Sequence, residues 1–303
     1  MPTLFDNSWS ALLRPGDATN FFLERCLRPF QSEAPAYSAV NAWWMAEICR
    51  VLYRRGPDEI GPLAHPVTRG HILRKVKLKE VRFIDKGTAH CALILSEIDP
   101  DRPFAILAFR GTTGFETWLS NLNTFQVPWM GEGLVHGGFK KEFYKLWYEV
   151  EDLLSELRCP VFYTGHSLGG ALAVMAASLA PPRAVYTFGA PKAGDAVFAN
   201  SLQRIRIYRL INNRDIVPTV PPSQIPFDFC HCGELLSFFN KNGHPKEAPS
   251  QPEESPSFPG ALRQVTSQLR RRLLDPPDFL IDHAPVNYTA HLTEELLKTN
   301  EDV

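Results

Sequence analysis

Short runs of β-branched and aromatic residues recur through the middle of the chain, and stretches with helical periodicity separate them. Each run is nearly continuous in apolar residues and ends at Gly, Pro or polar residues, a pattern typical of strands buried on both faces. The predicted strands are Ala89–Ser96, Phe104–Phe109, Val161–Thr164, Val185–Phe188 and Arg206–Ile211.

In the intervening stretches, apolar residues return every three or four positions, which predicts amphipathic helices. One such series runs from Phe139 to Leu157, and Leu168–Leu179 is a second stretch, dense in Ala and Gly. Asp195–Gln203 predicts a third helix. Strands that alternate with helices indicate a largely parallel sheet. We therefore predict an α/β fold with a mostly parallel central sheet flanked by helices on both faces.

The two ends of the chain differ from this middle region. Residues 1–60 carry an aromatic-rich helical pattern that includes Trp43, Trp44 and Ile48, and we expect it to pack against the sheet. Residues 243–260 are rich in Pro, Glu and Ser, with almost no large apolar residue, so they predict a flexible surface loop. A length of 303 residues fits one large domain or two small ones. We predict a single domain over 1–303.

Composition excludes few partners but narrows the location. Hydrophobic residues make up 44% and charged residues 21%, and the formal charge is −1, so bulk charge favours neither nucleic acid nor an anionic membrane surface. The longest small and apolar stretch, Ala171–Ala180, is too short to span a membrane. Met1–Cys26 lacks the basic start and apolar run of a signal peptide. The six cysteines do not resemble a disulfide framework. We expect a cytoplasmic protein, with export by another route as an open alternative.

The most informative motif is Gly165-His166-Ser167-Leu168-Gly169, which matches the pattern Gly-x-Ser-x-Gly. The pattern alone is loose, but here a predicted strand enters it and an Ala-rich helix leaves it. This context is that of the nucleophile elbow of α/β-hydrolases, in which a tight turn exposes a serine. We predict that Ser167 is a nucleophile; the alternative is a glycine-rich turn with a buried serine.

A serine nucleophile needs a base, and the base needs an acid to orient it. In this fold the chain order is serine, acid, histidine. Asp215 follows a predicted strand in a short polar loop, where catalytic groups collect, whereas Asp195 fits a helix N-cap better. We predict that Asp215 is the acid and that His283, in the loop before the last helix, is the base. His291, on that helix, is the fallback.

Two other histidines follow Asp215. His244 lies at the edge of the Pro-rich segment, which is a poor place for a rigid base. His231 lies between Cys230 and Cys232, but a Cys-His-Cys trio without a second ligand pair is a weak zinc signal. We predict no metal site and no cofactor.

Several ordered segments together resemble the class 3 (fungal-type) triacylglycerol lipase family of the α/β-hydrolase superfamily, over about residues 81–291. The segments are Phe109-Arg110-Gly111-Thr112, Trp118-Leu119-Ser120-Asn121-Leu122, Val135-His136-Gly137-Gly138-Phe139, Gly165-His166-Ser167-Leu168-Gly169-Gly170, Phe188-Gly189-Ala190-Pro191, Asn212-Asn213-Arg214-Asp215-Ile216-Val217-Pro218 and Asp282-His283 followed by Tyr288.

The resemblance implies an oxyanion hole formed by Thr112 and the N–H of Leu168. It also implies a lid over Phe115 to Trp129, with an apolar helical face that would cover Ser167 in water and open at a lipid surface. An ordinary packed helix is the alternative. The lid residues on that face are Phe115, Trp118, Leu119, Leu122 and Phe125.

The sequence as a whole predicts a lipase or carboxylesterase that cleaves glycerolipid esters through an acyl-enzyme on Ser167. Phospholipase A1, a short-chain carboxylesterase, an acyltransferase and a lipase-like binding protein without turnover are the alternatives. The expected partner is a lipid ester, at a lipid–water interface in the lid interpretation. The sequence indicates no oligomeric state.

Overall fold

The computed structural model describes residues 6–8, 10–11, 14–54, 67–111, 125–221, 223–224, 227–239, 245–246 and 278–301. Its centre is an eight-stranded sheet with the strand order β1-β2-β3-β6-β7-β8-β11-β12. The strands are β1 (Leu78–Lys86), β2 (Ala89–Ser96), β3 (Ala105–Arg110), β6 (Val161–His166), β7 (Ala184–Phe188), β8 (Ile207–Asn212), β11 (Glu234–Phe239) and β12 (Pro245–Lys246).

The middle of this sheet is parallel. Strands β3, β6, β7, β8 and β11 pair in parallel, whereas β1, β2 and β12 add antiparallel pairs at the two edges. Every residue of β7 and nearly every residue of β2, β3 and β6 is buried, as continuous apolar runs require. The predicted mostly parallel sheet is confirmed.

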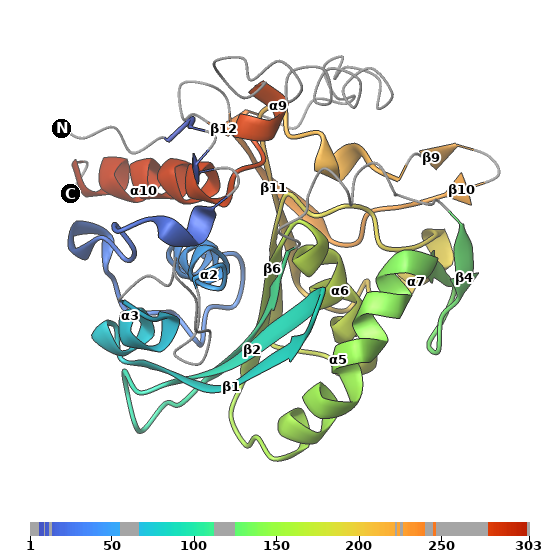
Figure 1. Ribbon diagram of the computed structural model, residues 1–303, viewed down its shortest axis with the longest axis horizontal. Coiled ribbons are helices and arrows are strands. Elements are labelled where there is room, and N and C mark those ends of the chain that lie inside the picture. The colour runs from blue at the N-terminus through green and yellow to red at the C-terminus, as the bar shows by residue number, and fades with distance from the viewer. Residues whose placement is uncertain are drawn as a thin grey trace.

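Helices cover both faces of the sheet (Figure 1). On one face lie α2 (Ala39–Val51) and α10 (Pro285–Glu301), and on the other lie α5 (Gly137–Ser155) and α6 (Leu168–Leu179). The shorter elements are α3 (Arg69–Lys75), α7 (Ala196–Ser201), α9 (Asp278–Ile281), β4 (Gln126–Pro128), β5 (Leu134–His136), β9 (Ser223–Gln224), β10 (Phe227–Asp228) and the 3-10 turns Pro15–Asp17, Glu24–Cys26 and Val217–Thr219.

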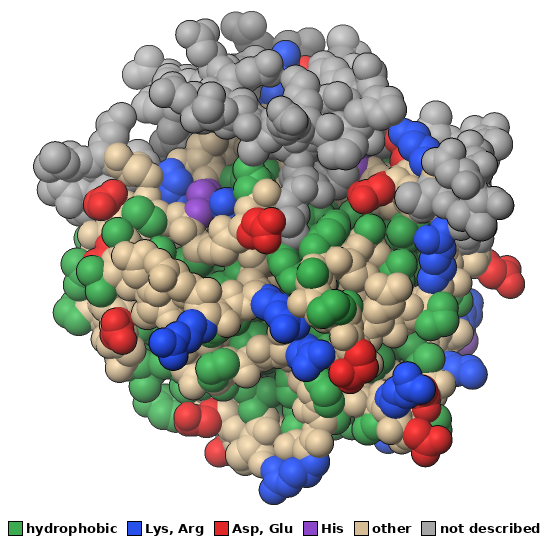
Figure 2. Space-filling model, turned by 180° about the vertical axis from the view of Figure 1, so that it is seen from behind, with side chains coloured by type: hydrophobic (Ala, Val, Ile, Leu, Met, Phe, Trp, Pro, Cys, Tyr) green, Lys and Arg blue, Asp and Glu red, His purple; other side chains and the backbone are tan. Residues whose placement is uncertain are grey.

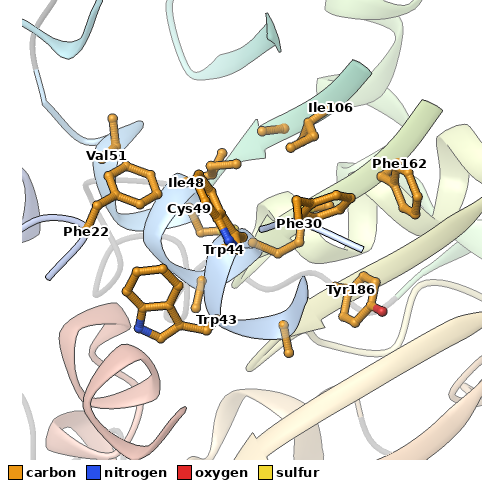
Figure 3. Close-up of a cluster of buried hydrophobic side chains, with 14 of the residues drawn as sticks. Phe22, Phe30, Trp43, Trp44, Ile48, Cys49, Val51, Ile106, Phe162 and Tyr186 are labelled. Carbon is orange, nitrogen blue, oxygen red and sulfur yellow. The ribbon is translucent and has the colours of Figure 1, made fainter. Parts of the chain in front are cut away.

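Helix α2 is buried on nearly all sides, and it fills the core between the sheet and α10 (Figure 3). Trp43 and Trp44 lie on this helix with exposures of 0% and 2%, and the indole N–H of Trp43 donates to Thr293 Oγ1 of α10 at 3.0 Å. Phe162 of β6 and Ile106 of β3 meet the same cluster from the sheet. The helix therefore joins the N-terminal and C-terminal parts of the chain to the central strands.

Two predicted segments lie largely outside the described residues. Of the predicted loop over 243–260, the structure describes only Pro245–Lys246, which pair with β11. Of the predicted lid over Phe115 to Trp129, it describes residues 125–129. Here the helical expectation is wrong, because Gln126–Pro128 pair with β5 as a strand and Trp129 is buried at 6% exposure. The pairing with β5 and the burial of Trp129 hold this end of the segment extended.

The described part of the surface carries charge of both signs. Basic and acidic side chains are interspersed over the face that Figure 2 shows, in agreement with the formal charge of −1. Among the described residues, no helix is long and apolar enough to cross a membrane.

Candidate active site

Ser167 lies at the turn between β6 and α6 in a strained backbone conformation. Its φ of 58° and ψ of −132° place a non-glycine residue in a region that L residues rarely adopt. The turn is held because the Ser167 N–H donates to the carbonyl of Phe188 on β7 at 2.9 Å. Ser167 is 2% exposed, and its Oγ makes no hydrogen bond with the residues that the structure describes. Among the residues that the structure describes, the hydroxyl therefore takes part in no structural hydrogen bond.

Glycines allow α6 to begin so close to the sheet. A Cβ on Gly165 would collide with the backbone carbonyl of Gly169, and a Cβ on Gly169 would collide with the carbonyl of Phe109. The elbow predicted from the sequence is confirmed in its backbone form. The N–H of Leu168 stands at the first position of α6, where it has no intrahelical acceptor, so it is available to an oxyanion.

Asp215 and His283 form a hydrogen-bonded pair. Nδ1 of His283 lies 2.9 Å from Oδ2 and 3.0 Å from Oδ1 of Asp215, and each residue is 3% exposed. A carboxylate only accepts, so Nδ1 carries the proton and Nε2 is left as the basic nitrogen. The carboxylate also accepts from the N–H of Val217 at 2.9 Å and from the hydroxyl of Tyr288 at 2.7 Å. Three donors from two segments thus fix the acid.

The base lies beside the elbow. The ring of His166, the residue before Ser167, is 4.5 Å from the ring of His283 between centroids, and its Nε2 donates to the His283 carbonyl at 2.7 Å. Gly189, which directly follows β7, packs against Asp215 and His283. A Cβ on Gly189 would meet Asp215 Oδ2 and lie 3.0 Å from His283 Nδ1. The structure therefore places the Asp215–His283 pair beside His166, the residue that precedes Ser167, while Ser167 Oγ and His283 Nε2 form no hydrogen bond with each other.

A second set of contacts fastens the loop of the base to the loop of the acid. Asn213 Nδ2 and the Arg214 N–H donate to the same carboxylate oxygen of Asp282 at 2.9 and 3.0 Å. Asn212 Nδ2 donates to the Asp282 carbonyl at 2.9 Å. Burial raises the pKa of Asp282 to about 6, against the hydrogen bonds from Arg214 and Asn213. Asp282 therefore links the loop that carries Asp215 to the loop that carries His283.

Tyr53, which follows α2, reaches the elbow from the N-terminal region. Its hydroxyl is 3.1 Å from Nδ1 of His166. Burial lowers the pKa of His166 well below its usual value, so the ring is neutral, and its single proton is on the Nε2 that donates to His283. Nδ1 of His166 must accept, and Tyr53 donates. The same hydroxyl lies against Gly111, the residue before Thr112. Sequence reasoning missed Tyr53 because no local spacing connects it with the elbow.

The other histidines considered from the sequence have separate surroundings. His231 donates to the Pro218 carbonyl at 2.8 Å, and burial lowers its pKa to about 3, with help from Arg209 and Lys192. His291, the fallback base, is buried at 4% exposure in α10, where burial lowers its pKa to about 4. Both are neutral packing residues, in keeping with the preference for His283. His244 lies outside the described residues.

Several predicted site residues fall in segments that the structure does not describe. These are Thr112 of the oxyanion hole and the lid residues Phe115, Trp118, Leu119 and Leu122. Their roles stay predictions. Within the described residues, no cluster of three or more His, Cys, Asp or Glu side chains could hold a metal ion.

Comparison with known proteins agrees with this geometry. Residues 106–225 match the family model described as Lipase (class 3). Over 146 residues, the chain is 34% identical to a lipase of Rhizomucor miehei, a match that covers 42% of this chain and 40% of the relative. Over 147 residues, it is 33% identical to secreted mono- and diacylglycerol lipase 1 of Fusarium solani, covering 44% of this chain and 43% of that one. The chain thus spans about 40% of the length of these curated relatives.

Solved structures extend the likeness beyond the family model. The native Rhizomucor miehei lipase propeptide complex matches with a TM-score of 0.52 and 25% identity over 67% of each chain. A mutant form of MDLA from Penicillium cyclopium matches with a TM-score of 0.57 over 81% of this chain and 95% of that one, at 15% identity, which speaks for the fold alone.

The parallel sheet and the strained serine between β6 and α6 define an α/β-hydrolase fold. Within that class, residues 106–225 match the model of the class 3 lipase family, and lipases are among the relatives and solved structures that the chain resembles.

Proposed function

We propose that this chain is a serine ester hydrolase that cleaves acyl esters of glycerolipids. The observation that carries the proposal is the bond from His283 Nδ1 to Asp215, next to the strained turn that holds Ser167. The names of the relatives, lipase and mono- and diacylglycerol lipase, support a lipid ester as the substrate class. The Ser167 hydroxyl has no hydrogen-bond partner among the described residues, which supports acyl transfer over binding alone.

The proposed reaction has two steps. Ser167 Oγ attacks the ester carbonyl carbon while Nε2 of His283 takes its proton, and Asp215 stabilises the imidazolium through Nδ1. The carbonyl oxygen becomes an oxyanion held by the Leu168 N–H, with Thr112 as the second proposed donor. The alcohol leaves with the proton from Nε2. Water then gives a proton to the same nitrogen and attacks the acyl carbon; the bond to Ser167 Oγ breaks, Oγ takes the proton from Nε2, and the acid is released.

Hydrolysis of a soluble ester tests the chemistry. Purified protein is assayed with p-nitrophenyl butyrate beside Ser167→Ala and a matched control, Ser201→Ala, whose serine lies on α7. We expect Ser167→Ala to lose at least about 10³-fold in kcat/KM and the control to be unchanged. Equal rates in all three proteins would refute the proposal and favour a lipase-like binding protein.

Substrate class needs a second measurement. Triacylglycerol, diacylglycerol and phospholipid are compared below and above their aggregation limits. A preference for acylglycerols supports the proposal, whereas a preference for phospholipid favours phospholipase A1. A rate that jumps at the aggregation limit supports the lid, and smooth saturation counts against it. Ester formation with an added alcohol would reveal acyltransferase activity.

A further inference from the structure

The turn that follows Asp215 depends on donors from other parts of the chain. It is the 3-10 turn Val217–Thr219, and most of its residues are buried. The N–H groups of Thr219 and Val220 donate to carbonyls three residues earlier in the chain. Among the described residues, no bond within the turn reaches the carbonyls of residues 218–221. Because buried carbonyls need hydrogen-bond donors, other segments must supply them.

Lys192 reaches three of these four carbonyls. It lies a few residues beyond the end of β7. Its Nζ donates to the carbonyl of Thr219 at 3.1 Å and to that of Pro221 at 3.2 Å. Its backbone N–H donates to the Val220 carbonyl, which lies between them in the chain, at 2.9 Å. A single residue therefore binds three consecutive carbonyls of the segment that follows the proposed acid.

The fourth carbonyl and the charge of Lys192 complete this arrangement. Nε2 of His231 donates to the Pro218 carbonyl at 2.8 Å, from a ring that is neutral because burial above all lowers its pKa to about 3. Burial also lowers the pKa of Lys192, while Cys230 opposes this shift and Arg209 adds to it. The two carbonyl oxygens that Nζ contacts favour the ammonium form, which has only donors, and hydrogen bonds from a charged donor are the stronger kind. Lys192 is therefore the stronger of the two restraints.

The turn takes part in orienting the acid. The Val217 N–H donates to Oδ1 of Asp215 at 2.9 Å, so a shift of the turn would move this donor. Lys192 belongs to the same segment as Gly189, where a Cβ would meet Asp215 and lie 3.0 Å from His283 Nδ1. The bonds from Lys192 thus join the turn that bonds to the acid with the segment that packs against the Asp215–His283 pair.

We propose that Lys192 is a positioning residue for ester hydrolysis. It acts through the turn Val217–Thr219, which it holds in the place where the Val217 N–H orients the Asp215 carboxylate toward His283 Nδ1. This role rests on the proposed function, in which these two side chains are the acid and the base.

Kinetics with p-nitrophenyl butyrate test the role. Lys192→Met keeps the length of the side chain and removes its donors. The matched control is Lys140→Met, because Nζ of Lys140 on α5 also donates to a backbone carbonyl, that of Pro128, at 2.6 Å. We expect Lys192→Met to lower kcat about 10-fold and to change KM less than about 2-fold, since a misplaced acid impairs proton transfer more than ester binding. Lys192→Arg keeps the charge and the donors, so it should retain kcat within about 3-fold of wild type, and Lys140→Met should equal wild type.

A second readout needs no turnover. The proton on Nδ1 of His283, in its bond to Asp215, gives a far-downfield proton NMR signal, which is assigned by its absence in His283→Gln. We expect this signal to broaden and move upfield in Lys192→Met, because a less ordered carboxylate leaves the proton open to exchange with water. The signal should match that of the wild type in Lys140→Met and in Lys192→Arg.

These outcomes separate the two proposals. An unchanged NMR signal or an unchanged kcat in Lys192→Met would overturn the positioning role, and so would an equal loss in Lys140→Met. Absence of turnover by the wild-type chain would instead overturn the ester-hydrolase proposal, while the NMR comparison would still show whether Lys192 orients Asp215. If thermal melts show that Lys192→Met does not fold, Lys192→Gln takes its place. Its shorter amide can reach at most one of the two carbonyls, so we expect the same direction of signal change and about a 3-fold loss of kcat.

Discussion

Removal of one hydroxyl, by Tyr288→Phe, tests whether the acid is held in place from α10. The Tyr288 hydroxyl donates to Asp215 Oδ2 at 2.7 Å and accepts from the Asn212 N–H at 3.0 Å, and the residue is fully buried. Its pKa is raised well above the usual value by burial and by Asp215, so the hydroxyl stays protonated and keeps donating.

The structure sets the size of the effect. A hydrogen bond to a charged group contributes about 1.5–3 kcal/mol, and a buried N–H left unsatisfied costs about 1–3 kcal/mol. Tyr288→Phe should therefore lower the free energy of unfolding by about 3 kcal/mol. In catalysis, Asp215 keeps the Val217 N–H and His283 as partners. We expect kcat to fall about 10-fold, far less than the loss on the order of 10⁴-fold that follows removal of the acid's role.

The assay separates positioning from mere destabilisation. kcat and KM for p-nitrophenyl butyrate are measured well below the unfolding temperature, with Tyr186→Phe as the matched control. Tyr186 is equally buried on β7, but its hydroxyl bonds to Ser38 and Asn41, away from the acid. The control should lose stability and keep kcat. Equal kcat values for the two variants would refute the idea that Tyr288 positions Asp215.

Three further changes test other parts of the site. Tyr53→Phe removes the hydroxyl that donates to His166. Because one neutral hydrogen bond contributes about 1 kcal/mol, we expect up to about a 5-fold loss of kcat/KM with little change in the pH profile of the reaction. An unchanged kcat/KM would exclude a role for this contact. Gly189→Ala and Gly87→Ala both place Ala at positive φ, at a cost of about 1 kcal/mol each. Only the Cβ at position 189 would meet Asp215 and His283, so activity should drop at least about 10-fold in Gly189→Ala alone. Equal activity of the two variants would argue against crowding at Asp215. Asp282→Asn tests the carboxyl group whose folded-state pKa is raised to about 6. This group favours folding while it is protonated, so its contribution is complete below about pH 4 and is lost as the pH rises through about 6. In thermal melts, the variant should be more stable than wild type by about 1 kcal/mol at pH 8 and equal to it at pH 4, and the reverse pH order would contradict this.

The central strands and the elbow could be predicted because their signals are local. Strand β2 and helix α6 have the predicted bounds, β6 and β7 differ from theirs by two residues and one residue at one end, and β3 and β8 are shifted by one residue at both ends. Asp195 caps α7 as expected, by accepting from the Phe198 N–H at 2.8 Å. A strand that is buried on both faces needs a continuous apolar run, and the chain shows it directly.

The edge strand β1 escaped prediction for the same physical reason. Leu78–Lys86 carries Lys79, Glu80 and Arg82, and most of its residues are exposed or half-buried because the strand has a partner on one side only. Arg82 and Lys86 pair instead with Glu149 of α5 across the surface. A rule that looks for apolar runs passes over such a strand.

The positioning residues could not be read from spacing, since each acts across the fold. Tyr53 and His166 are 113 positions apart, and Tyr288 and Asp215 are 73 apart. Only the packing of α2 and α10 against one face of the sheet brings these hydroxyls to the ends of β6 and β8. Tyr288 was part of the family-like motif, but its contact with Asp215 had no sequence signal of its own.

The segment that matches the family model contains only part of the candidate site, because other residues of the site lie before and after it. Residues 106–225 contain the proposed nucleophile, acid and oxyanion donors. The proposed base and Tyr288, which bonds to the proposed acid, follow that segment, and Tyr53 precedes it. Since α2 and α10 also pack on each other, a change that loosens either helix should disturb both tyrosine contacts at once. The catalytic geometry is therefore a property of the whole sheet face, and core substitutions in α2 should lower kcat together with stability.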